Sequence, residues 1–140
     1  MNLFGADVPA GGEDVKLEVS RVEMPLVVQI DIKPGEFPND IQVGANGTLP
    51  VAILSTASFD ATTVDAATVN LAGAPTQLKQ DGTPQAGMED VNYDGRLDLV
   101  VHVIRESMMF GEDDSQGVLG GQTRNGTSIR GVDSVRPIFK

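Results

Sequence analysis

The sequence contains no cysteine and no tryptophan, and among its 140 residues it has one tyrosine and one histidine. Without cysteine there is no disulfide framework, no thiolate metal site and no cysteine nucleophile. The shortage of aromatic side chains disfavours a sugar-binding platform, because such platforms use exposed aromatic rings. No apolar run approaches the roughly 18 residues of a membrane span. Residues 1–14 also lack the basic end and the apolar stretch of a signal peptide.

Positive charge is also scarce, since 10 Lys and Arg residues stand against 20 Asp and Glu residues and give a formal net charge of −10. Such a balance argues against nucleic-acid backbones and anionic membranes as partners. It suits a chain that binds cations, as well as one that is merely soluble. A length of 140 residues predicts one domain with a real hydrophobic core.

Short apolar segments separated by turn-forming residues dominate the chain, and no convincing amphipathic helix is present. This pattern predicts an all-β fold, a single immunoglobulin-like β-sandwich. The strongest hairpin signal is Asn125-Gly126. One or two helical turns are expected within residues 58–67, with Asp65 as a cap, and a loop is expected over 73–87. Strands are predicted at 15–22, 26–32, 41–43, 49–54, 69–71, 97–103, 117–124, 127–132 and 134–139.

Glycine, proline and the alternation of apolar residues divide the N-terminal part of the chain into a leader and a first strand. Residues 1–14 hold several Gly and Pro residues without periodicity, which predicts a flexible leader. Residues 15–140 form the β-sandwich domain, and its first segment, 15–24, is a candidate for strand exchange. That strand can pair with the open edge of its own sheet or with a sheet of a neighbouring subunit.

Oxygen-bearing residues recur at alternate positions between Met88 and the strand 97–103. Calcium takes six to eight hard oxygen ligands, which alternate residues of a tight loop can direct at one centre. Gly95 permits the positive φ of the sharp bend that returns the chain. The sequence therefore predicts a calcium loop that leads into a core strand. The five expected ligand positions are Asp90, Asn92, Asp94, Arg96 (through its backbone carbonyl) and Asp98.

This loop departs from an EF-hand, because the position that should hold a bidentate Glu is Val101, inside an apolar strand. The remaining oxygens must come from elsewhere, and the candidates are Asp31, Glu89 and the acidic cluster 112–114. Magnesium is disfavoured, since it keeps several waters and seldom uses such a loop. A simple hairpin turn at Asp94-Gly95 is the competing interpretation, but it leaves the spaced donors unexplained.

Catalytic residues are hard to find in this sequence. His102, the single histidine, lies on the predicted strand 97–103 and is expected to be a half-exposed strand residue. No nucleophile motif accompanies it. Paired carboxylates that could cleave a glycoside are better used as metal ligands. The sequence predicts that the protein is not an enzyme.

The sequence resembles a recurrent calcium-binding β-sandwich module of secreted bacterial multidomain proteins, over roughly residues 26–138. Its calcium loop alone is also similar to dockerin repeats. The resemblance rests on IDIKPG (30–35), PN (38–39) with Ile41, PVAIL (50–54), FDATTVD (59–65), EDVNYDG (89–95) with LDLV (97–100), and GVDSVR (131–136).

The resemblance implies an extracellular, secreted protein with a β-sandwich fold, bound calcium and no catalytic role. It also implies functional weight for Asp31, Glu89 and Asp133, which join the expected metal residues. Family members often carry a cysteine pair near the final hairpin, where this sequence has Val118 and Val132. That departure makes calcium the more important cross-link.

Two functions follow as expectations. The first is a calcium-stabilised structural subunit that self-associates into a fibre or matrix by donating its N-terminal strand, a head-to-tail contact that does not close. The second is a calcium-dependent accessory module for binding or adhesion, with a polysaccharide or protein ligand. In both cases calcium is the expected cofactor, with neither nucleic acid nor a membrane span as partner.

Overall fold

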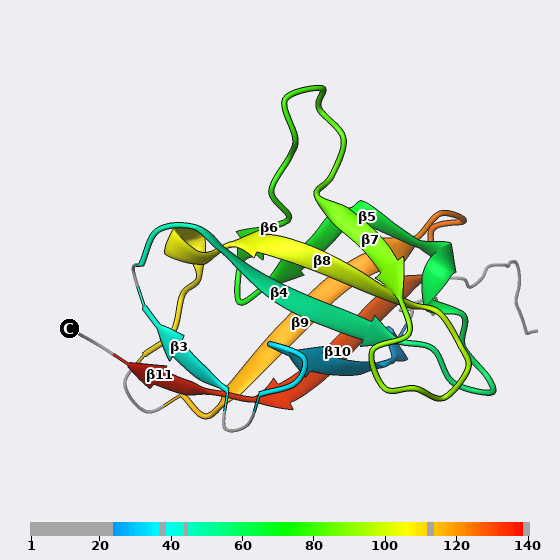
Figure 1. The fold of residues 1–140 in the computed structure, drawn as a ribbon, viewed down its shortest axis with the longest axis horizontal. Coiled ribbons are helices and arrows are strands. Elements are labelled where there is room, and N and C mark those ends of the chain that lie inside the picture. Colours follow the sequence, from blue (N-terminus) through cyan, green and yellow to red (C-terminus); the bar gives the residue numbers. More distant parts are fainter. Residues whose placement is uncertain (1–23, 37–38, 44, 112–113, 139–140) are drawn as a thin grey trace, which may run out of the picture.

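The computed structural model describes residues 24–36, 39–43, 45–111 and 114–138. Strands dominate this part of the chain (Figure 1), and the only helices within it are two 3-10 turns of three residues each, η3 (Ala61–Thr63) and η4 (Arg105–Ser107). The predicted all-β fold is confirmed. The strands are β1 (Leu26–Val27), β2 (Gln29–Ile32), β3 (Asp40–Gln42), β4 (Thr48–Leu54), β5 (Val64–Leu71), β6 (Ala74–Pro75), β7 (Ala86–Glu89), β8 (Asp98–Ile104), β9 (Gln116–Thr123), β10 (Ser128–Ser134) and β11 (Arg136–Ile138).

The strands form three sheets that pack together. One has five strands in the order β1-β10-β9-β5-β6, one has four in the order β2-β4-β8-β7, and β11 pairs with β3 in a third. The four-stranded sheet crosses in front of β9 and β10 in Figure 1, whereas β3 and β11 lie together at one end. β1 and β2 are consecutive yet belong to different sheets, so the start of the domain joins the two large sheets.

β8 is an inner strand of the four-stranded sheet, between β4 and β7, and the burial of its residues alternates. Leu99, Val101 and Val103 are buried, whereas Val100 and His102 between them are half-buried. β4 pairs with β8 and carries Pro50 opposite His102. Full burial of an aliphatic side chain contributes about 1.5–3 kcal/mol to the free energy of folding, so the burial of this core drives folding. Its fully buried members are Ile32, Ile41, Leu49, Val51, Ile53, Val69, Leu71, Val101, Val103 and Leu119.

The helical turn predicted within 58–67 is confirmed as η3, but its predicted cap is wrong. Asp60 caps it, by accepting from the Thr62 amide. Asp65 lies in β5 instead, because the β-branched Val64 and Val69 have their side chains in the core. The loop expected at 73–87 contains β6 and the start of β7, which pair with β5 and β8. Both strands are short and lie among the Gly and Pro residues of this segment, so turn-forming residues hid them.

The final hairpin is confirmed. β9 and β10 pair antiparallel around Asn125-Gly126, where Gly126 has φ +91°. Val118 and Val132 face each other in register. The cross-strand position for which the resemblance implies a cysteine pair is thus occupied by two valines.

The predicted last strand is also confirmed, as β11, and an ion pair fastens it to β3. Arg136 Nε donates to Asp40 Oδ1 at 2.7 Å, and Arg136 Nη2 donates to Asp40 Oδ2 at 2.9 Å. The hydrogen bonds from Arg136 lower the pKa of Asp40 below its ordinary value of 3.8. A carboxyl with a lowered pKa stabilises the folded state above its unfolded pKa, and this contribution is lost as the pH falls through the folded value.

We therefore expect Arg136→Gln to raise the pKa of Asp40 towards 3.8, as followed by carbon-13 NMR titration of the carboxyl group. Asp81 is the internal control, because Thr83 holds its pKa low at a site without Arg136. An unchanged Asp40 titration in the variant would contradict the role of the ion pair.

The predicted N-terminal elements, the leader 1–14 and the strand 15–22, lie outside the described residues, as does most of the segment 15–24. No helix in the described part of the chain is long and apolar enough to cross a membrane.

Candidate metal centre

The predicted calcium loop connects β7 to β8. Glu89 ends β7 and pairs in register with Asp98, the first residue of β8, so residues 90–97 form the turn between two paired strands. Tyr93 and Gly95 both adopt positive φ, at +57° and +87°. Glycine adopts this conformation without strain, which explains Gly95. The loop therefore reverses the chain tightly while both of its ends are fixed in the sheet.

Three polar side chains converge inside this loop. The amide of Asn92 lies between the carboxylates of Asp90 and Asp94, and its nitrogen donates to Asp90 Oδ1 and to Asp94 Oδ1, at 3.1 Å each. Carboxylate and amide oxygens are ligands of calcium. If the Asn92 amide turned by half a turn, its oxygen would join the two carboxylates as a ligand, so these three side chains could hold a calcium ion.

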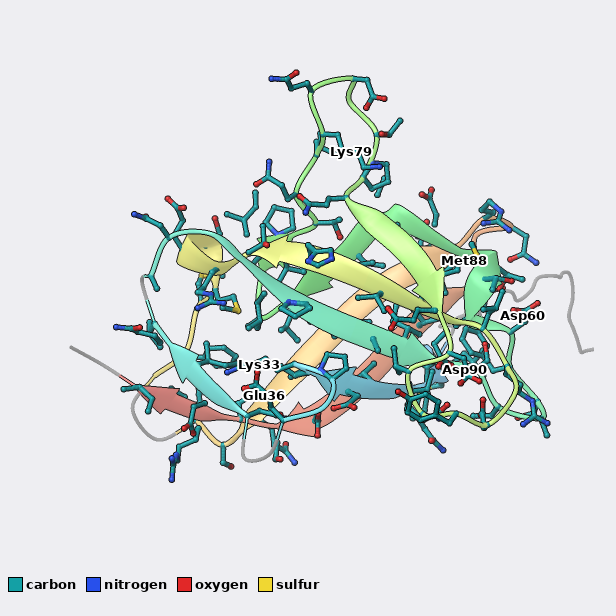
Figure 2. The ribbon with its side chains drawn as sticks, in the orientation of Figure 1. Lys33, Glu36, Asp60, Lys79, Met88 and Asp90 are labelled. Atoms are coloured by element: carbon teal, nitrogen blue, oxygen red, sulfur yellow. The ribbon has the colours of Figure 1, made fainter. Side chains whose placement is uncertain are left out.

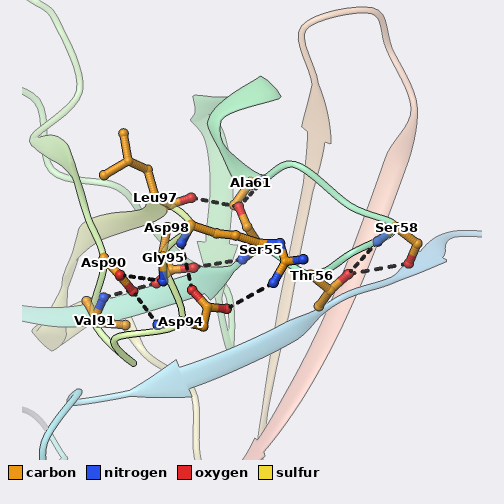
Figure 3. Close-up of polar contacts among 11 residues, drawn as sticks. Ser55, Thr56, Ser58, Ala61, Asp90, Val91, Asp94, Gly95, Leu97 and Asp98 are labelled. Carbon is orange, nitrogen blue, oxygen red and sulfur yellow. Dashed lines mark hydrogen bonds and ion pairs between the residues drawn. The ribbon is translucent and has the colours of Figure 1, made fainter.

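Backbone amides hold the carboxylates of this triad in place. Asp90 accepts from the Asp94 amide at 3.1 Å through Oδ1 and from the Gly95 amide at 2.9 Å through Oδ2. Asp94 Oδ1 accepts from the Arg96 amide at 2.9 Å. These bonds are drawn in Figure 3. They orient the carboxylates from within the loop, and each carboxylate oxygen can still use a second lone pair.

Asp98 plays a different part from the one expected of a fifth ligand. Its side chain is fully buried, and Oδ1 accepts from the Ser55 amide at 2.8 Å while Oδ2 accepts from the Val91 amide at 3.0 Å. Asp98 therefore ties the start of the loop to the end of β4, as Figure 3 shows. A buried carboxylate is tolerated only where hydrogen bonds or a cation compensate for lost hydration, and the two amides supply part of that compensation.

Ser55 is a site residue that the sequence did not reveal. Its hydroxyl donates to the Leu97 carbonyl at 2.7 Å and accepts from the Ala61 amide at 2.8 Å, so it joins the loop to η3 (Figure 3). The only sequence signal is a small polar residue directly after the apolar strand β4. That signal is common at strand ends, and its partners lie six and more than forty positions away.

The remaining predicted ligands are distributed over three regions. Arg96 adjoins the triad, with Nη1 at 3.8 Å from Asp94 Oδ2, and Glu89 is exposed beside the loop at the end of β7. Asp31 and Asp133 lie together elsewhere, between β2 and β10. Asp114 accepts from the Gly111 amide at 2.7 Å within its own turn. Glu112 and Asp113 lie outside the described residues.

The donor set of the loop suits a hard cation. Carboxylate and amide oxygens are among the ligands that calcium prefers, and the loop brings two carboxylates and one amide together. Across the described ranges, no group of three or more His, Cys, Asp or Glu side chains is placed to hold a metal. The loop brings together two carboxylates, those of Asp90 and Asp94, with the amide of Asn92 between them. Calcium would therefore complete its shell with carbonyl and water oxygens.

A scan against protein-family models finds no match for this chain, and a search of curated proteins finds no similar sequence.

Proposed function

We propose that this chain is an extracellular structural protein whose immunoglobulin-like β-sandwich is stabilised by calcium bound in the loop 90–98. The observation that carries the proposal is the convergence of the Asp90, Asn92 and Asp94 side chains at the entrance to β8. Two neighbouring carboxylates repel each other without a cation, and a cation bound between them would remove this repulsion. The extracellular location is supported by the resemblance to secreted modules and by the acidic composition.

The mechanism is linkage between binding and folding. The loop can bind calcium only when β7 and β8 are paired, because its two ends are then held at Glu89 and Asp98. A ligand that binds only the folded state stabilises it by about 2.7 kcal/mol at a hundredfold excess over the dissociation constant. Extracellular calcium modules commonly bind at roughly 10⁻⁴ to 10⁻³ M. Such a protein is most stable where calcium is plentiful, outside the cell.

Self-assembly by strand donation is the second part of the proposal. β1 runs parallel to β10 with Leu26 opposite Ile129, and β10 begins one residue earlier, at Ser128. A strand that continued β1 towards the N-terminus would therefore pass beyond the end of β10. This geometry favours pairing of residues 15–22 with another subunit.

The outer edge of β7 is the acceptor that we propose for the donated strand. β7 is an end strand of its sheet, and within the described ranges its outer edge has no partner. Met88 on this strand is 52% exposed. An open edge of this kind is a template for an added strand from another chain. Donation of residues 15–22 to it would link subunits head to tail.

We expect the full chain to sediment as polymers in calcium, and Val19→Asp to remain monomeric, because the charge falls on the apolar face of the donated strand. Ser20→Asp is the matched control, since it adds the same charge on the opposite face and should still polymerise. Analytical ultracentrifugation and electron microscopy, with calcium and with chelator, measure the difference. A wild-type chain that stays monomeric at high calcium and high protein concentration would remove the self-assembly proposal.

A second candidate function is an accessory binding module. An open depression of about 540 Å³ lies beside the loop, and its wall includes Phe59, Asp60, Arg96 and Leu97. Its volume is within the range of small-ligand sites, and Arg96 connects it to the calcium loop. Calcium-dependent binding to a glycan array, lost in Arg96→Ala, would favour this function over assembly.

A further inference from the structure

At four places in this chain, glycine directly follows asparagine or aspartate. All four pairs are exposed and lie between consecutive strands, and each glycine has a positive φ between +87° and +96°. In such a pair the glycine amide nitrogen can attack the side-chain carbonyl of the preceding residue, because glycine has no Cβ to hinder the approach. Exposure and φ are alike, so neither decides which pair reacts. The pairs are Asn46-Gly47, Asp81-Gly82, Asp94-Gly95 and Asn125-Gly126.

Hydrogen bonds engage three of the four glycine amides. Each of the three donates at 2.9 Å to an oxygen of its own turn: Gly82 to the Lys79 carbonyl, Gly95 to Asp90 Oδ2 and Gly126 to the Thr123 carbonyl. Exposure does not prevent this bonding, because Lys79 and Gly82 lie on the hairpin that projects from the sheets in Figure 2. An amide held in this way is a poorer nucleophile, since its hydrogen bond must break before it attacks.

The Gly47 amide, by contrast, has no hydrogen-bond partner among the residues that the structure describes, and neither has the side chain of Asn46. Nothing lies within 4 Å of the position that a Cβ would take at Gly47, so the turn has room for the attack. The nucleophile and the carbonyl that it would attack are therefore both available at this pair.

Asn125 is the matched counterpart of Asn46, since each begins the tripeptide Asn-Gly-Thr. The Oδ1 atom of Asn125 accepts from the hydroxyls of Thr123 and Thr127, from the second at 3.1 Å. The amide of Gly126 is engaged as well. The same three residues therefore form an open turn at one place and a hydrogen-bonded turn at the other.

We propose that Asn46 is a site of spontaneous deamidation and that the fold protects Asn125 from the same reaction. The Gly47 nitrogen loses its proton to base in the solvent and bonds to Asn46 Cγ. The Cγ–Nδ2 bond breaks, and Nδ2 takes up a proton and leaves as ammonia, so a five-membered succinimide remains. Water then opens this ring on either side of the Gly47 nitrogen and gives aspartate or isoaspartate. Overall, one water is consumed and one ammonia is released.

Isoaspartate would alter the turn between β3 and β4, because it lengthens the main chain by the Cβ atom of residue 46. This turn is held against η4 by two bonds from Arg105. The Gly47 carbonyl accepts from the Arg105 amide at 3.0 Å, and the Thr48 carbonyl accepts from Arg105 Nη2 at 2.9 Å. We therefore expect the modified chain, separated by ion exchange through its added negative charge, to melt at a lower temperature than the unmodified chain.

Peptide mapping by mass spectrometry tests the proposal on the full chain. During incubation in oxygen-18 water, Asn46 is expected to exchange its side-chain amide for a labelled hydroxyl and to give two separable products. Asn125 should react about tenfold more slowly, because its hydrogen bonds must break first. The reaction needs no calcium, so the same result is expected in chelator. Equal conversion of the two residues, or no conversion of Asn46, would overturn the proposal.

The unfolded chain separates the effect of the fold from that of the local sequence. In guanidinium chloride, Asn46 and Asn125 are expected to react at similar rates, since the protecting bonds are lost. An Asn46 that keeps its full advantage there would assign the preference to its sequence neighbours and would overturn protection by the fold.

Thr123→Val tests the protection within the folded chain. It removes the hydroxyl that donates to Asn125 Oδ1 and keeps the shape of the buried side chain. Conversion of Asn125 should therefore rise severalfold, while that of Asn46 stays the same. An Asn125 that remains as unreactive as in the wild type would contradict the role of its side-chain bonds.

Discussion

Asp94→Asn is expected to abolish most of the stabilisation that the loop gains from calcium while it leaves the calcium-free protein nearly unchanged. Asp94 contributes one of the three converging side chains, and its Oδ1 also accepts from the Arg96 amide. Asparagine retains an oxygen that can accept this bond but removes the charge that attracts the ion. At a hundredfold excess of calcium over the dissociation constant, the expected loss is about 2.7 kcal/mol.

Thermal unfolding in calcium and in chelator measures this effect. For a domain of this size, the expected fall in melting temperature is about 8 °C in calcium and close to zero in chelator. Glu106→Gln controls for the change in net charge. Equal losses in the two conditions would show that Asp94 has a purely structural role.

Asp90 is a less selective probe of the same site. It binds the Asp94 and Gly95 amides through its two oxygens. Alanine at this position removes both bonds as well as a metal ligand. Asp90→Ala should therefore lower stability in chelator as well as in calcium, and only the difference between the two conditions reports the ion.

The largest loss is expected for Asp98→Ala, and calcium should not rescue it. The carboxylate of Asp98 is fully buried and accepts from the Ser55 and Val91 amides. A hydrogen bond to a charged group contributes about 1.5–3 kcal/mol, so losing two costs about 3–6 kcal/mol. Natural domains are stable by only about 5–15 kcal/mol in total, and the variant is therefore close to unfolding.

Urea denaturation with and without calcium tests this prediction. Asp98→Asn is the informative comparison, because it is isosteric and keeps one oxygen for one of the two amides. It should lie between the wild type and alanine. A strong loss in calcium together with a negligible loss in chelator would show instead that Asp98 acts mainly through the ion.

Much of the fold could be predicted because its signals are local. The alternation Leu99, Val101, Val103 predicts the core strand β8, and Asn125-Gly126 predicts the hairpin between β9 and β10. By contrast, β7 has no apolar alternation of its own. It becomes a strand because β8 offers it a paired edge, which no local pattern reveals.

The sequence by itself determined the tight loop between β7 and β8, since the spacing of Asp90, Asn92 and Asp94 before Gly95 depends only on neighbouring residues. Only the tertiary structure decided which acidic residues act together. It brought Asp98 to Ser55, and it joined Asp133 to Asn39 far from the loop. The physical reason is that loop geometry follows from adjacent backbone angles, whereas contacts between distant strands depend on sheet register and core packing.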